Sequence, residues 1–187
     1  MKDMSAEAVG MHMPAVVTLD DLSAMNAADP YGHRYETSPE GVLSVMLPPD
    51  SEHATIASRL FAWLIMAGWP ADQVLQVAGI RVPGPAGDGG RIPDLSIWRK
   101  PPPAGVWLAV DHLLLVIEIV SPGSEALDEV TKRREYAAAG IPQYWVVNRD
   151  AAQTTTLYRL TSDGAYQERA KMPLAWLLQT TPADHIG

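Results

Sequence analysis

The sequence predicts an α/β fold of mixed α+β type, in which a mixed central β-sheet is flanked by helices. Some stretches repeat apolar residues at helical spacing, whereas other short stretches are rich in β-branched residues and leucine. The chain also has 16 prolines and 14 glycines, many of which fall between these stretches and indicate turns. Because helical and extended stretches interleave without strict alternation, a mixed sheet is the natural way to pack them.

The length of 187 residues suggests one domain with a substantial core. We expect residues 1–17 to be loosely ordered and residues 18–187 to form this single domain. The first 13 residues hold one lysine and lack the apolar segment of a secretory signal. No stretch approaches the roughly 20 apolar residues of a membrane span. We therefore expect a cytoplasmic protein with no membrane partner.

The charged residues limit the function without defining it. The chain has no cysteine, which excludes disulfides and thiolate metal sites. A formal net charge of −8 argues against a protein that coats nucleic acid, although an enzyme can combine an acidic surface with a local basic one. We interpret the basic clusters as solvated faces. These clusters are Arg91, Arg99 and Lys100, and Lys132, Arg133 and Arg134.

Capping signals and periodicity place the elements of the N-terminal half. Thr18 can cap a short helix, with Asp20 and Asp21 favourable in its first turn. A longer helix starts at Ser51, and its apolar residues recur at helical spacing until Gly68 ends it. The expected elements are a helix at 19–25, a hairpin of strands at 34–36 and 42–47, a helix at 51–67, strands at 73–82 and 92–98, and a flexible loop at 83–90.

The C-terminal half begins with the most apolar run of the chain, residues 113–120, which predicts a buried central strand. Ser124 can cap the next helix, which ends near residue 139 before Gly140 and Pro142. The remaining expected elements are a strand at 144–148, a hairpin of strands at 154–160 and 166–172, and a short helix at 174–178.

The helix after Ser124 has two distinct stripes on a helical wheel. Its apolar side, which we expect to face inward, comprises Leu127, Val130, Ala137 and Ala138, with Arg134 in the middle. Asp128, Lys132, Glu135 and Tyr136 lie on another stripe. Arg134 is therefore the more inward basic residue by pattern, and Lys132 reaches the sheet from the edge.

Two carboxylates occur in apolar surroundings. Glu118 lies inside the run 113–120, where an unpaired charge is costly, and Asp94 begins an apolar strand. If these strands pair, Asp94 and Glu118 converge, because alternate residues share a face. Converging carboxylates repel unless one is protonated or a cation lies between them. A hard ion such as Mg²⁺ prefers oxygen ligands and usually keeps several waters, so two carboxylates suffice to bind it.

Each of these residues also has an ordinary structural interpretation. Asp94 can be a turn residue after Pro93, and Glu118 can form an ion pair with a nearby basic side chain. Lys132 can form an i,i+4 salt bridge with Asp128, worth about 0.3–0.5 kcal/mol. Residue types and spacing leave these alternatives open.

Several segments together resemble a known family. They are Arg34-Tyr35-Glu36, His53 with Leu60, Pro93-Asp94, Glu118-Ile119-Val120-Ser121-Pro122, Asp128 with Lys132 and Tyr136, Gly140, and Tyr144-Trp145-Val146-Val147. Over residues 34–148 the chain resembles the Uma-two family of restriction-endonuclease-like proteins, within the PD-(D/E)XK nuclease superfamily. The resemblance implies a restriction-endonuclease-like core.

The resemblance also implies a function, namely a metal-dependent endonuclease that hydrolyses phosphodiester bonds in nucleic acid, with DNA as the expected substrate. Asp94 and Glu118 would be catalytic and would hold Mg²⁺ or Mn²⁺. The superfamily places a lysine two residues after the glutamate, where this chain has Val120. The resemblance implies that Lys132 supplies this catalytic cation instead, and that the protein pairs as a homodimer.

Other residues are candidates for lining the site. A nuclease core of this kind often carries a further acid, for which Glu52 and Glu36 are both available, and Arg134 is a rival of Lys132. The additional candidates are Glu36, Glu52, His53, Ser121, Asp128 and Arg134. The alternative is a catalytically inactive nuclease-fold module that binds nucleic acid or protein, which Val120 and the acidic net charge favour.

Overall fold

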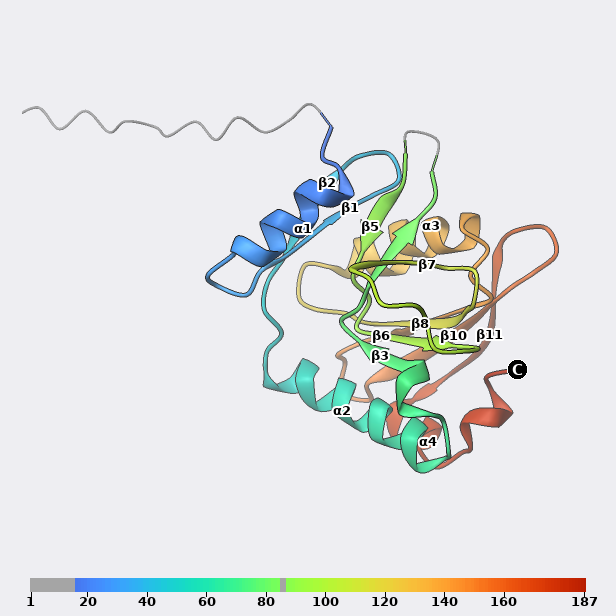
Figure 1. Ribbon diagram of the computed structural model, residues 1–187. Coiled ribbons are helices and arrows are strands. Elements are labelled where there is room, and N and C mark those ends of the chain that lie inside the picture. The colour runs from blue at the N-terminus through green and yellow to red at the C-terminus, as the bar shows by residue number, and fades with distance from the viewer. Residues whose placement is uncertain (1–15, 85–86) are drawn as a thin grey trace, which may run out of the picture.

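The computed structural model describes residues 16–84 and 87–187. The expected loosely ordered segment 1–17 falls almost entirely outside the described residues. The described chain forms a mixed α+β fold with two mixed β-sheets and flanking helices, which confirms the predicted fold class (Figure 1). The strands divide between two sheets, whereas the sequence predicted one.

The helices predicted at 19–25, 51–67 and 174–178 are confirmed, whereas the helix predicted after Ser124 is divided into a π-helix and a short α-helix and has no side-chain cap. Thr18 caps α1 in a capping box with Asp21, and Asp50 caps α2 by accepting a hydrogen bond from the His53 backbone N–H. The helical elements are α1 Leu19–Ala28, α2 Ser51–Met66, η1 Ala71–Gln73, the π-helix η2 Leu127–Lys132, α3 Arg133–Ala138, α4 Leu174–Leu177 and η3 Pro182–Asp184. Among the described residues, none of these helices combines the length and apolar character needed to cross a membrane.

The larger sheet has six strands in the order β11-β10-β9-β8-β6-β3. These strands are β3 Val74–Gln76, β6 Leu95–Trp98, β8 Leu113–Ile119, β9 Gln143–Val147, β10 Thr154–Leu160 and β11 Tyr166–Pro173. β8 pairs antiparallel with β6 and parallel with β9, so it is central and buried. The paired register includes Leu95 opposite Ile117, as the proposed convergence of Asp94 and Glu118 requires.

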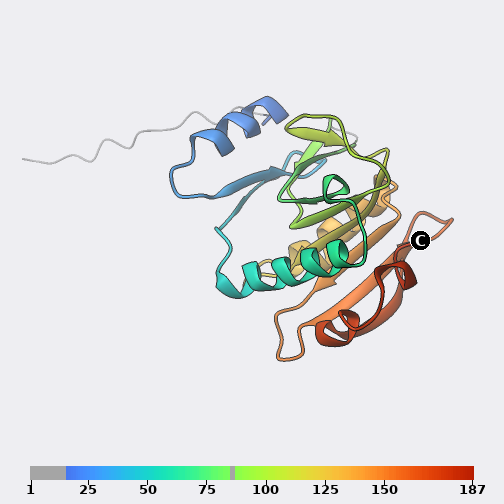
Figure 2. The same ribbon diagram turned by 60° about the horizontal axis from the view of Figure 1, so that its bottom comes forward.

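The two faces of the larger sheet bury different kinds of residue. One face carries Leu95, Leu115 and Ile117, which pack with Ile56 and Leu60 of α2. Figure 2 shows α2 running along this face. The opposite face carries Trp98, Val116 and Tyr144, which pack with Tyr136 of α3. Because side chains alternate along a strand, Glu118 lies on the same face as Val116, toward η2 and α3.

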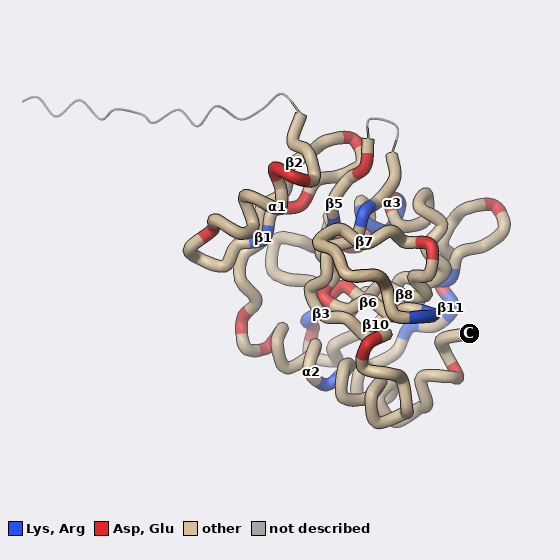
Figure 3. Tube along the Cα trace, in the orientation of Figure 1, with Lys and Arg blue, Asp and Glu red and all other residues tan. Residues whose placement is uncertain are grey.

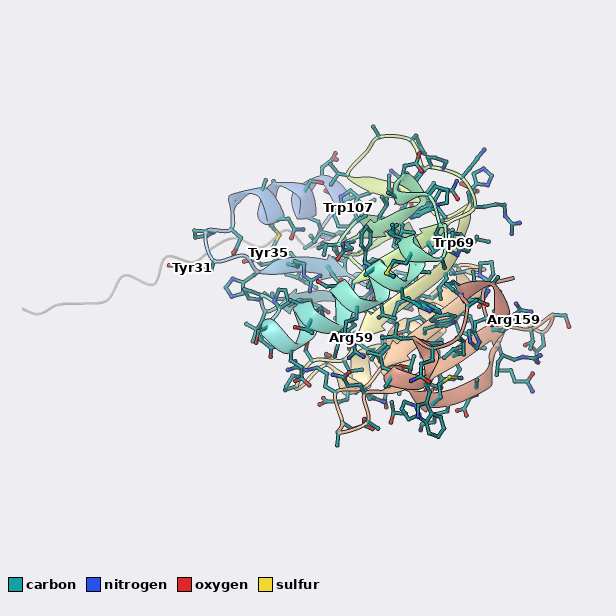
Figure 4. The ribbon with its side chains drawn as sticks, turned by 90° about the horizontal axis from the view of Figure 1, so that it is seen from below. Tyr31, Tyr35, Arg59, Trp69, Trp107 and Arg159 are labelled. Carbon is teal, nitrogen blue, oxygen red and sulfur yellow. The ribbon has the colours of Figure 1, made fainter. Side chains whose placement is uncertain are left out.

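The smaller sheet has the strand order β2-β1-β5-β4-β7. These strands are β1 Arg34–Thr37, β2 Leu43–Met46, β4 Gly79–Val82, β5 Gly89–Arg91 and β7 Trp107–Ala109. The Trp107 indole N–H donates to the Leu19 carbonyl, which ties α1 to this sheet (Figure 4). A Cβ atom at Gly90 would lie 2.8 Å from Leu22 Cδ1, so this close approach needs glycine.

The predicted strand 73–82 is wrong as a single element. Val77 has φ +54° and separates β3 from β4, which belong to different sheets. The predicted strand 92–98 likewise starts later, at Leu95, since Pro93 has no N–H to donate to a sheet. Gly89–Arg91 forms β5, although most of this strand fell within the loop predicted at 83–90. Residues 85 and 86 of that loop lie outside the described residues.

Candidate active site

A cleft of about 560 Å³ lies beside the ends of β1, β6 and β8 and is bordered by α2 and η2. It is the location at which most of the predicted site residues meet. The predicted residues that line it are Glu36, His53, Asp94, Glu118, Ser121, Asp128 and Lys132. Glu52 and Arg134 do not line the cleft.

Asp94 immediately precedes β6 and is buried. Its Oδ2 accepts a hydrogen bond of 2.8 Å from the Ile119 backbone N–H and lies 3.0 Å from His53 Nε2. Its Oδ1 lies 3.4 Å from the Arg34 guanidinium. Burial alone would raise the pKa of Asp94, but the hydrogen bond and charge of His53, together with Arg34, hold it below its ordinary value. The carboxylate is therefore ionised and held in orientation.

Glu118 is the second-to-last residue of the central strand β8 and is also buried. Its Oε1 lies 3.0 Å from Lys132 Nζ and accepts a hydrogen bond of 2.8 Å from the Tyr136 hydroxyl. Burial, together with the charges of Asp128, Asp94 and Glu36, outweighs the ammonium of Lys132 and raises the pKa of Glu118 to about 8. Asp94 and Glu118 thus lie in one cleft with pKa values shifted in opposite directions.

Lys132 is 2% exposed and is surrounded by acids. Its Nζ lies 3.0 Å from Glu118, 3.4 Å from Glu36 and 3.3 Å from Asp128. Burial alone would lower the pKa of Lys132, but these three carboxylates raise it above its ordinary value. The i,i+4 salt bridge with Asp128 therefore exists, and so does the contact between Lys132 and the buried glutamate.

The inward side of this helix was predicted incorrectly. Val130 is 60% exposed and Arg134 is also exposed, so Arg134 is not a rival of Lys132. The buried stripe consists of Asp128, Lys132, Glu135 and Tyr136. The apolar-side rule failed because this helix covers acids of the sheet, and its own charged side chains are satisfied by pairing with them.

A second buried ion pair, between Arg91 and Glu135, lies outside the cleft lining and contacts Glu36 of the cleft. Arg91 of β5 donates two hydrogen bonds of 2.8 and 2.7 Å to Glu135 and lies 3.3 Å from Glu36. Glu36 also accepts a hydrogen bond from the Ile92 backbone N–H. Figure 3 shows basic and acidic positions together where β5 runs beside α3. The prediction of solvated basic faces is thus wrong for Arg91 and Lys132, because both are buried in these pairs.

The structure separates the two acids proposed as additional site residues. Glu36 lies in the cleft, whereas Glu52 lies outside it on α2, 48% exposed and 2.6 Å from Arg149. Adjacent residues of a helix point about 100° apart, so His53 faces inward while Glu52 faces solvent. Sequence reasoning did not place Arg34, Arg91 or Arg149 at the site, because the acidic partner of each arginine is distant in sequence.

Two comparisons relate this chain to known proteins. A family model described as "Uma2: Putative restriction endonuclease" matches residues 19–183. The chain belongs to the Uma2 family. Among solved structures, this Uma2 chain is similar to a putative nuclease of the DUF820 family from Anabaena variabilis ATCC 29413. That similarity covers 79% of this chain and 82% of the other, with 19% identity and a TM-score of 0.57, which supports a shared nuclease fold. No curated protein matches the chain.

The Uma2 cleft carries an excess of buried negative charge. Five buried acids lie in or next to the cleft, Glu36, Asp94, Glu118, Asp128 and Glu135, against the cations Arg34, Arg91 and Lys132 and the imidazole of His53. Such an excess is relieved either by a proton, which the raised pKa of Glu118 favours, or by a bound cation. Oxygen donors of this kind suit a hard divalent ion.

The donor set of this Uma2 chain fits Mg²⁺ or Mn²⁺ better than a metal that needs a full protein cage. Within residues 16–84 and 87–187, no three His, Asp or Glu side chains are grouped so that they could hold one ion. Asp94 and Glu118 offer two carboxylates at the cleft, and Mg²⁺ commonly binds through one or two carboxylates and keeps its remaining waters. His53 Nε2 lies 3.0 Å from Asp94 Oδ2, a contact that holds this carboxylate in orientation.

Proposed function

We propose that this Uma2 protein is a metal-dependent endonuclease that hydrolyses phosphodiester bonds in DNA. The observation that carries the proposal is the arrangement of two buried carboxylates in one cleft, one just before β6 and one in the adjacent strand β8, with Lys132 Nζ 3.0 Å from Glu118. Membership of a restriction-endonuclease family and a nuclease fold point the same way. Asp94 and Glu118 are the residues that would hold Mg²⁺ or Mn²⁺.

The chain's own residues have distinct tasks in this proposal. A bound divalent ion would supply Lewis acidity toward a phosphoryl oxygen and a more acidic water. Asp94 remains ionised, and the Ile119 N–H and His53 keep its carboxylate in place. Lys132 holds a positive charge beside Glu118, where it would favour the negative charge that develops on the phosphate in the transition state.

The test is cleavage of supercoiled plasmid DNA with Mg²⁺ or Mn²⁺ by the wild-type protein and the variants Asp94→Asn and Glu118→Gln. Loss of one group that acts mainly in the transition state reduces the rate by at least about 10²-fold. The matched controls Asp111→Asn and Glu168→Gln alter exposed acids and are expected to cleave normally. If either cleft variant cleaves at the wild-type rate, the assignment of that carboxylate is wrong.

The second candidate is a catalytically inactive module that binds nucleic acid or protein. Two observations favour it: Val120 occupies the expected lysine position, and Lys132 is 2% exposed and already paired with three carboxylates. Calorimetry with Mn²⁺ separates the candidates. Binding that Asp94→Asn abolishes favours the nuclease, whereas no binding together with no cleavage of DNA or RNA favours the inactive module.

The expected homodimer and the cytoplasmic location remain predictions. Sedimentation velocity of the full chain over a range of concentrations tests the dimer. A sedimentation coefficient that stays at the value of one chain would contradict it.

A further inference from the structure

Arg34 differs from the other buried or half-buried cations around the cleft in how poorly it is paired. Its NH1 lies 3.4 Å from Asp94 Oδ1, at the long end of hydrogen-bond distance. Its Nε is buried and has no hydrogen-bond partner within the described part of the chain. A charge-assisted hydrogen bond is normally about 2.7–2.9 Å long, so this guanidinium has unused donor capacity.

The neighbouring cations are paired more closely with carboxylates than Arg34 is. Arg91 makes two short hydrogen bonds with Glu135, and Arg149 is held at 2.6–3.0 Å by Asp50 and Glu52. Lys132 has three carboxylate partners. Among these cations Arg34 is therefore the one with donors available for a ligand.

Asp94 does not depend on Arg34 for its position. Its Oδ2 is held by the Ile119 N–H at 2.8 Å and by His53 at 3.0 Å. These contacts are shorter than the Arg34 contact and use the other carboxylate oxygen. The side chain of Arg34 is 16% exposed and lines the cleft, so a ligand can reach it.

We propose that Arg34 binds the non-bridging oxygens of a phosphate of the nucleic-acid strand in this cleft. The planar guanidinium presents two parallel N–H donors that match two phosphate oxygens, which an ammonium cannot reproduce. Arg34 is therefore a substrate-binding residue next to the candidate catalytic carboxylate. The inference rests on the proposed function in that the ligand is taken to be nucleic acid.

Binding in EDTA tests the inference without cleavage. The probe is a fluorescein-labelled DNA duplex, measured by fluorescence anisotropy at increasing KCl concentrations. Arg34→Gln is expected to weaken binding about 5- to 10-fold, and the slope of log affinity against log salt falls by about 1, as expected for one lost phosphate contact. Arg34→Lys retains the charge but lacks the paired N–H donors of the guanidinium, so its affinity for the duplex is expected to lie between those of wild type and Arg34→Gln.

A matched control and a folding measurement accompany the variants. Arg169→Gln removes the same charge from an exposed position on β11 and is expected to bind within about twofold of wild type. Thermal unfolding shows whether each variant is folded. If Arg34→Gln does not fold, Arg34→Lys carries the test, and binding equal to wild type then overturns the proposal.

The outcomes separate this inference from the proposed function. Weaker binding and a reduced salt slope in Arg34→Gln support Arg34 as the phosphate ligand, even if the wild-type protein never cleaves DNA. Normal binding and an unchanged slope overturn it, even if cleavage depends on Asp94. If Arg34 only neutralises Asp94, Arg34→Gln strengthens Mn²⁺ binding and leaves DNA binding unchanged. Absence of any DNA binding by the wild-type protein also overturns the proposal.

Discussion

Lys132 Nζ lies 3.0 Å from Glu118 Oε1, which joins the helix η2 to the central strand β8 through a fully buried ion pair. The contact connects residues that the sequence separates by 14 positions. The superfamily's lysine would stand two residues after the glutamate, where this chain has Val120, so Lys132 reaches Glu118 from the following helix instead. The stability of the cleft is therefore coupled to its charges.

Replacement of Lys132 by methionine is expected to destabilise the protein by about 3–5 kcal/mol, because three buried carboxylates lose their shared cation. Guanidinium denaturation measures the free energy of unfolding. Lys171→Met, at an exposed position on β11, is the control and should change it by no more than about 0.5 kcal/mol. A loss in Lys132→Met equal to that of the control would show that the buried pair is not needed for folding.

Arg91→Lys keeps the charge but cannot form both hydrogen bonds with Glu135. At least one buried carboxylate oxygen is then left unsatisfied, and the free energy of unfolding is expected to fall by about 1–3 kcal/mol. Urea denaturation measures this change. The comparison is Arg81→Lys, since Arg81 is half exposed and 3.5 Å from Asp88, and there we expect an effect near zero. Equal effects at the two positions would contradict the prediction.

Asp29, which lies outside the cleft, is expected to make the free energy of unfolding depend on pH. Burial alone would raise the pKa of Asp29, but hydrogen bonds from His33, Tyr31 and Tyr35 hold it well below its ordinary value of 3.8. A carboxyl with a lowered pKa in the folded state contributes stability above its unfolded pKa, and this contribution is lost as the pH falls through the folded pKa.

The unfolding free energy of Asp29→Asn should therefore be lower than that of wild type at about pH 7, and the two should approach one another toward about pH 2. Asp72→Asn, on the exposed turn η1, is the control and should parallel wild type. A difference between wild type and Asp29→Asn that stays constant over this range would exclude the pH dependence.

Val77 adopts φ +54°, a conformation that is costly for a β-branched residue, and its side chain is 51% exposed. Val77→Gly should raise the free energy of unfolding by about 0.5–1 kcal/mol, because relief of strain outweighs the added flexibility of the unfolded chain. Val106 is similarly exposed at a negative φ, so Val106→Gly should destabilise. Thermal denaturation of both variants checks the contrast, and a loss of stability in Val77→Gly would refute it.

Much of the local structure could be predicted from the sequence. Thr18 and Asp50 mark helix starts through their side chains, and Gly68 ends the helix α2. The run that contains Glu118 is a buried strand, as its continuous apolar content predicted. These signals depend only on residues close in the chain, so they are readable without the fold.

The division into two sheets could not be predicted in the same way. The sequence predicts strands around Val77 and Pro93, but the pairing of these strands depends on partners that are distant in the sequence. The residue pattern of a strand does not show which sheet the strand joins, because strands of both sheets need alternating or apolar residues. Only the observed pairing assigned β3 and β4 to different sheets.

By itself, the sequence determined that Asp94 and Glu118 are acids in apolar strands and that a basic helix follows them. The tertiary structure alone decided which charges meet there. It brought Glu36 rather than Glu52 into the cleft, buried Lys132 rather than Arg134, and placed Arg34 beside Asp94. The physical reason is that buried charges are tolerated only with partners, and these partners come from distant segments of the chain.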